Sequence, residues 1–99
     1  MYRRFIEANF GRVHLKGFEY LVAACEMFAE GNHKISSVYH DVARKYKHEG
    51  ATYARVERDI RHYINGIESY VMFDALPYMP NATNKAVVAA IVYAIENSK

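Results

Sequence analysis

The stretch from Val38 to Ile64, VYHDVARKYKHEGATYARVERDIRHYI, decides the fold of this chain. Apolar residues recur in it at intervals of three and four, which is the spacing of amphipathic helices. A short polar turn, KHEGA at residues 47–51, interrupts the pattern, and its Gly50 is free to take a left-handed conformation. Two helices joined by a tight, glycine-containing turn form a helix-turn-helix, and the stretch predicts this motif.

The second of these helices is strongly two-faced. It begins at Thr52, a favourable N-cap residue, and we expect it to continue to about Tyr70. With ~100° between successive residues, one narrow arc of the helix is apolar and predicts the core side. That arc carries Val56, Ile60, Tyr63 and Ile67. The opposite arc carries Ala54, Arg55, Glu57, Arg58, Arg61 and His62.

The remaining helices follow from the same spacing. We expect them at about Tyr2–Asn9, about Leu15–Glu30, from the capping residues Ser36 and Ser37 to about Tyr46, and from Thr83 or Asn84 to about Asn97. Both prolines fall in the stretch LPYMPNAT, which is the clearest break in the chain. The prediction is all-α: one compact five- to six-helix domain over residues 1–99, with a central helix-turn-helix at about residues 37–70.

Composition narrows the class of protein. The 99 residues are 52% hydrophobic, which suits a globular domain. The net charge of +2 is too small to indicate a partner, so the distribution of the charge has to be considered. Cys25 is the only cysteine, so no internal disulfide can form, and it lies on the apolar face of its helix. The start is not a secretory signal and the longest uncharged run is too short for a membrane span, so we expect a cytoplasmic protein and no membrane partner.

Two readings of the charged helix face stay open from the residues alone. It is either a solvated face with spaced ion pairs, such as Glu57 with Arg61, or a surface for DNA. The second helix of a helix-turn-helix lies in the major groove, where arginine matches the two acceptors of guanine and glutamate accepts from cytosine. Lysines and arginines nearby, among them Lys16, Arg44, Lys45 and Lys47, would then contact phosphates.

A resemblance favours DNA. The stretches HLKGFEYL (14–21), VYHDVARKY (38–46), RVERDIRH (55–62) and the pair Thr83-Asn84 occur in this order. Together they resemble the C-terminal effector domain of the sporulation initiation response regulator, the stage zero sporulation protein A family. The similarity spans nearly the whole chain.

The resemblance implies a bacterial transcription regulator that binds short promoter boxes, often in tandem. It implies base reading by Arg55, Glu57 and Arg58. Backbone contacts are expected from Arg61, His62, Thr52, Lys47 and Lys16. The chain departs from the family pattern in a turn about three residues longer between Tyr46 and Arg55, in Asp59, and in a shorter, more aromatic connection from Asn65 to Ala82. Family members also carry a receiver domain before this domain.

Other functions are weaker interpretations. No histidine pair has a recognisable metal-ligand motif and no nucleophile has a base, so we expect no metal, no cofactor and no enzyme. The alternative is a helical protein-interaction module that has lost DNA reading. Nucleic-acid binding without sequence preference is a further alternative, and the residues favour it less. The last helix, KAVVAAIVYAI, is apolar almost all round, so we expect core on one side of it. Its other side leaves open a homodimer or tandem self-association on DNA. RNA polymerase is a further partner left open, and we expect the protein on the nucleoid.

Overall fold

The computed structural model describes residues 1–98, and every element in this part of the chain is helical. The helices are α1 (Tyr2–Phe10), α2 (Lys16–Ala29), α3 (Ile35–Lys45), α4 (Tyr53–Asn65), α5 (Ser69–Ala75) and α6 (Asn84–Glu96), with a short 3-10 helix, η1 (Lys47–Glu49), between α3 and α4. The all-α prediction is confirmed.

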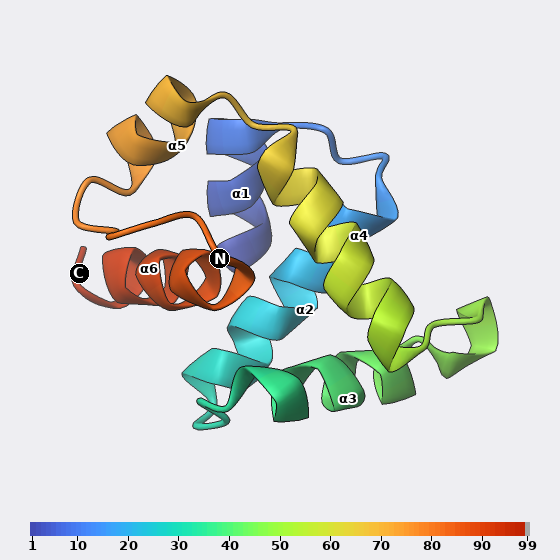
Figure 1. Cartoon of the computed structure of the whole chain (residues 1–99). Helices are drawn as coiled ribbons and strands as arrows, with labels where there is room; N and C mark the ends of the chain where they lie inside the picture. Colours follow the sequence, from blue (N-terminus) through green and yellow to red (C-terminus); the bar gives the residue numbers. More distant parts are fainter. Residues whose placement is uncertain (99) are drawn as a thin grey trace.

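Helix α2 is the centre of the packing. It contacts α1, α3, α4 and α6, which surround it in Figure 1. Its residues from Tyr20 to Cys25 are all buried, because a helix with neighbours on several sides needs apolar or small side chains nearly all round. Cys25 is fully buried, and burial raises the pKa of its thiol, as expected of a small core residue.

Helices α3 and α4 form the predicted helix-turn-helix. They pack against each other and against α2, and η1 projects from the corner between them (Figure 1). Gly50 ends η1 with φ 81°, in the left-handed region that a glycine favours. The side chain of Thr52 caps α4, as its residue type predicts.

Two boundaries of the predicted motif are wrong. Helix α3 begins at Ile35 after Lys34, and no side chain caps it, so Ser36 and Ser37 lie inside its first turn. Helix α4 ends at Asn65, not near Tyr70. The chain turns at Gly66 and forms the separate helix α5, in which Met72 is buried. Ile67, which was expected on the core side of α4, is half-buried in the connection between the two helices.

Helix α6 completes the core by packing against α1, α2 and α4. It begins after Thr83, whose hydroxyl accepts a hydrogen bond from the Ala86 backbone N–H at 3.2 Å. One face of the helix is buried, and its members are Val87, Val88, Ile91, Val92 and Ile95. The prediction that one side of this helix forms core is confirmed, while Tyr93 stays 61% exposed on another side.

Candidate nucleic-acid interface

The start of α4 is fixed by its cap and by the preceding turn. The hydroxyl of Thr52 accepts a hydrogen bond from the backbone N–H of Arg55 at 3.2 Å. The backbone N–H of Ala51 donates to the carbonyl of Tyr46 at 3.3 Å, which ties the turn back to the end of α3. The first turn of α4 therefore has a defined position relative to α3.

Because the apolar side of α4 is buried in the core, its charged side faces solvent. Val56 and Ile60 are fully buried, and Tyr63 and Ile64 are nearly so. Arg55, Arg58, Arg61 and His62 are all exposed, and Glu57 is half-buried at the flank toward α6. From Thr52 to His62 the helix rises ~15 Å, enough to cross a major groove about 12 Å wide.

Carboxylates partly engage two of the three arginines. Arg61 forms an ion pair with Glu57, one turn earlier on the same helix. The Nε of Arg58 lies 3.5 Å from an oxygen of Asp59, although 52% of the Arg58 side chain remains exposed. Exposed pairs of this kind contribute little, about 0–1 kcal/mol, and exchange readily for a partner with more negative charge.

Arg55 differs from the other two arginines. Its guanidinium has no ion pair or side-chain hydrogen bond with any of residues 1–98. One of its nitrogens lies over the turn, 3.8 Å from the position that a Cβ on Gly50 would take. This cation is available to a ligand without first losing a carboxylate partner.

The lysines expected at the DNA backbone lie beside the turn. The Nζ of Lys16, at the start of α2, lies 3.7 Å from a carboxylate oxygen of Glu49 in η1. Lys47 is exposed on η1 itself. The structure thus brings Lys16 and Lys47 to the end of the motif where α4 begins, whereas His62 lies toward the other end of α4. Arg44 pairs with Asp41 at 2.9 Å, and Lys45 lies 3.8 Å from Glu26 of α2.

The middle of α4 lies unusually close to α2. A Cβ on Gly17 would lie 2.3 Å from the carbonyl oxygen of Asp59 and 2.7 Å from the Cβ of Tyr63. Only glycine allows the two helices to approach this far. The sequence showed a glycine inside a helical pattern, but it did not show which helix it would meet.

The end of α4 is held by the segment between α1 and α2, a contact that sequence reasoning missed. Arg12 donates from Nη1 to the carbonyl of Tyr63 at 3.0 Å, and its guanidinium carbon lies 5.1 Å from the centre of the Tyr63 ring. The Tyr63 hydroxyl donates to the carbonyl of Gly11 at 2.6 Å. Gly66 provides the space for the Arg12 side chain, because a Cβ at this position would lie 2.1 Å from the Arg12 guanidinium.

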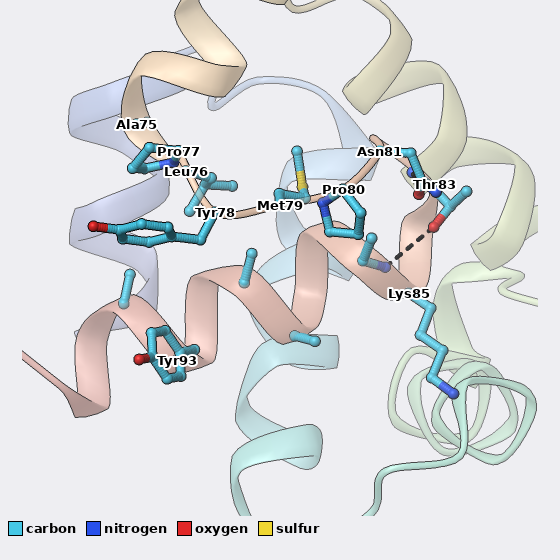
Figure 2. A pocket seen from close by; sticks show the side chains of 14 residues that line it. Ala75, Leu76, Pro77, Tyr78, Met79, Pro80, Asn81, Thr83, Lys85 and Tyr93 are labelled. Atoms are coloured by element: carbon cyan, nitrogen blue, oxygen red, sulfur yellow. Dashed lines mark hydrogen bonds between the residues drawn. The ribbon is translucent and has the colours of Figure 1, made fainter.

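Away from this surface, the connection from α5 to α6 forms an open apolar groove with one face of α6. Its volume is about 730 Å³. Figure 2 shows Tyr78 over α6 at one end, Pro80 further along, and the Lys85 side chain extending away from the groove. The floor is made of small side chains of α6: Ala86, Ala89, Ala90 and Ala94.

Between residues 1 and 98 the chain has neither a cluster of metal-ligating side chains nor a helix suited to cross a membrane. No three histidine, cysteine, aspartate or glutamate side chains between residues 1 and 98 gather as a metal site would require. None of the helices over the same residues combines the length and the apolar character needed to cross a lipid bilayer.

Helices α3 and α4, with the turn between them, form a helix-turn-helix whose second helix has a cationic face exposed to solvent. The model of the family described as sporulation initiation factor Spo0A C terminal matches residues 8–95, so the chain belongs to this family. It is a family of DNA-binding regulatory domains from the sporulation response regulator. No curated protein and no solved structure matches the chain.

Proposed function

We propose that this domain reads promoter DNA by placing α4 in the major groove. One observation carries the proposal: α4 buries its apolar side completely and leaves Arg55, Arg58 and Arg61 exposed on the other side. Arginine is the side chain that best matches the paired acceptors of guanine. The family supports DNA binding as such, and the choice of helix and of bases is the finer part of the proposal.

In this proposal the roles follow position on α4. Arg55, Glu57 and Arg58 read bases, because they lie in the first two turns of the helix, which enter the groove first. Arg61 and His62 contact the backbone further along α4. Thr52, Lys47 and Lys16 contact phosphates at the turn, where Lys16 exchanges its pairing with Glu49 for a phosphate.

Selection of bound duplexes from a random pool, followed by titration of the best sequence against a scrambled one, tests the proposal. Arg58→Ala is expected to cost ~1–3 kcal/mol of binding free energy and to relax the choice at one base pair. Arg4→Ala, an exposed arginine on α1, is the matched control and should bind as the parent does. If Arg58→Ala discriminates the two duplexes as well as the parent, α4 does not read through Arg58.

A specific observation favours a rival function. Glu57 and Asp59 each engage an arginine of the reading surface, which lowers the positive field that DNA would meet. The rival is a helical interaction module that kept the fold and lost DNA reading. Weak binding to every duplex with no dependence on salt, together with a stable complex with a protein, would favour it.

We also propose self-association through α6 on tandem DNA sites. The apolar groove lies beside Tyr78, which is 90% exposed, and Tyr93, which is 61% exposed. Exposed aromatic side chains around an apolar groove are common where a partner docks, and here we assign a second copy of the chain. Sedimentation of the domain on a two-site duplex should lose the doubly bound species in Tyr93→Glu and keep it in Tyr70→Glu, an exposed tyrosine outside the groove.

The cellular setting is part of the same proposal. A promoter-binding domain of this family would act in the cytoplasm, on the nucleoid, and RNA polymerase is the partner that regulation of transcription would involve. Whether bound RNA polymerase is recruited or blocked would follow from a footprint of the polymerase with and without the domain.

A further inference from the structure

One side-chain amide joins three helices beside the reading surface. Asn84 is the first residue of α6, and its Nδ2 donates two hydrogen bonds. One goes to the hydroxyl oxygen of Tyr39 on α3, at 2.9 Å, and the other to the backbone carbonyl of Glu57 on α4, at 3.1 Å. A primary amide carries two N–H donors, so both bonds can form together.

The acceptor on α4 lies where base reading is proposed. A backbone carbonyl has two lone pairs, so the oxygen of Glu57 can accept from Asn84 while it also serves its own helix. Asn84 is half-buried, and the bond joins residues 27 apart in sequence. The contact therefore fixes the backbone of Glu57 directly, whatever its carboxylate does.

A second contact holds α4 on another side. The carbonyl of Asp59 lies against Gly17 of α2, too close for any Cβ at that position. Residues two apart on a helix are separated by ~200° around its axis, so Glu57 and Asp59 lie on opposite flanks of α4. Helix α4 is thus held between α2 at one flank and Asn84 at the other, and it cannot rotate about its axis while both contacts stay.

We propose that Asn84 is a positioning residue for DNA reading, and that its bond to the Glu57 carbonyl sets the rotation at which α4 presents its side chains to the bases. The inference rests on the proposed function of α4. A rotation of α4 would displace Arg55, Glu57 and Arg58 from base edges but would leave flexible lysines on their phosphates, so specificity should suffer before general affinity does.

The test is the ratio of affinities for a duplex selected by the parent domain and for its scrambled version. In Asn84→Ala this ratio should fall about tenfold, the scale of one lost hydrogen bond, with the salt dependence of binding unchanged. Unfolding in urea, measured on the same samples, confirms that each variant is folded during the titration.

Two further variants separate positioning from general weakening. Asn84 donates to the Tyr39 hydroxyl, and Asn84→Asp can keep a bond there in the reverse direction by accepting from that hydroxyl, but it cannot donate to Glu57. An acid in the first turn of α6 is favourable for that helix. It should lose specificity as Asn84→Ala does. Its added negative charge should weaken binding to both duplexes by the same factor, so this effect cancels in the ratio of the two affinities. Tyr39→Phe removes only the other acceptor and should keep the parent ratio.

The outcomes are distinct. A parent ratio well above one that is unchanged in Asn84→Ala and Asn84→Asp overturns the positioning role and leaves the proposed function intact. A Tyr39→Phe ratio as low as that of Asn84→Ala also overturns it, because the α3 bond would then be the one that matters. A parent ratio of one overturns the proposed function and this inference with it.

Discussion

The guanidinium of Arg12 and the backbone carbonyl of Tyr63 are joined by a hydrogen bond of 3.0 Å, although the two residues lie 51 positions apart. The carbonyl belongs to the last turn of α4, which carries the negative end of the helix dipole, and its other partner is the Gly66 backbone N–H at 3.3 Å. A cation placed there both satisfies the carbonyl and opposes the dipole. The end of the proposed reading helix is therefore set by the segment between α1 and α2.

Replacing Arg12 should destabilise the fold. We expect Arg12→Ala to lower the free energy of unfolding by about 1–2 kcal/mol, because it removes a charge-assisted bond to a partly buried carbonyl. Urea unfolding followed by circular dichroism measures the change. Arg4→Ala, which removes an exposed arginine from α1, should stay within about 0.5 kcal/mol of the parent. Equal stabilities of the two variants would show that the Arg12 bond contributes nothing.

A Cβ at Gly17 should be poorly tolerated. Alanine is the better helix former by up to ~1 kcal/mol, but its Cβ would lie 2.3 Å from the Asp59 carbonyl oxygen, which is backbone and cannot move aside alone. We expect overpacking to prevail and Gly17→Ala to lose about 1–3 kcal/mol of stability or more. Glu26→Ala, at an exposed position of the same helix, is the control. A Gly17→Ala domain as stable as the parent would contradict the close approach of α2 and α4.

The features of the fold and the site that could be predicted from the sequence are those set by residues close together in the chain. The two faces of α4 and its cap at Thr52 follow from neighbours within one turn, and both were predicted correctly. The end of α4 was placed too late, although Asn65-Gly66 is a local turn signal, while the contact of Arg12 with this end comes from a distant part of the chain. Ser36 and Ser37 suggested a cap that α3 does not use. The Asn84 contact with Glu57 joins residues 27 apart. Local spacing carries no information about such contacts, although the pair Thr83-Asn84 is part of the resemblance to the family.

Stability should fall in alkaline solution because of buried tyrosines. Burial raises the pKa of Tyr63 from 10.0 to about 12, against the lowering effect of Arg12. The unfolded chain therefore loses this proton first, and between pH 10 and about 12 the folded state binds more protons than the unfolded one. The contribution is fully present below pH 10 and is lost as the pH rises toward 12. Urea unfolding at several pH values between 8 and 11 measures the slope.

The variant Tyr63→Phe provides the comparison for that slope. It is less stable at neutral pH, since its ring lacks the hydroxyl that donates to Gly11, but its stability should fall less steeply above pH 10. The slope should not vanish, because burial also raises the pKa values of Tyr2, Tyr20, Tyr39, Tyr46 and Cys25. Parallel curves for the parent and the variant would rule out a distinct contribution from Tyr63.

Lys47 should affect DNA affinity without affecting sequence choice. It lies exposed on η1, beside the start of α4, and the proposal assigns it a contact with the phosphate backbone. Lys47→Ala should weaken selected and scrambled duplexes by the same factor and reduce the slope of log affinity against log salt by about one. Fluorescence anisotropy between 50 and 200 mM salt, about the range over which such slopes are measured, provides the test. A loss confined to the selected duplex would mean that Lys47 contacts a base.

Thr52 and Thr83 form a matched pair for separating folding from DNA contact. Each caps a helix through its hydroxyl, which accepts from the backbone N–H three residues later at 3.2 Å. Thr52→Ala and Thr83→Ala should therefore each cost about 1 kcal/mol of stability. Only Thr52 lies at the start of the proposed reading helix, so only Thr52→Ala should weaken binding to the selected duplex beyond what its stability explains.

Serine keeps the capping oxygen, and this decides between two explanations of a Thr52→Ala defect. Thr52→Ser should recover both the stability and the affinity, because its hydroxyl can still accept from Arg55 and can donate to a phosphate. Titrations are made at a temperature at which all variants are folded, so that loss of a cap acts only on the local position of the helix that it caps, α4 for Thr52 and α6 for Thr83. If Thr83→Ala weakens DNA binding as strongly as Thr52→Ala, the loss of a helix cap explains both defects and Thr52 makes no contact of its own with DNA.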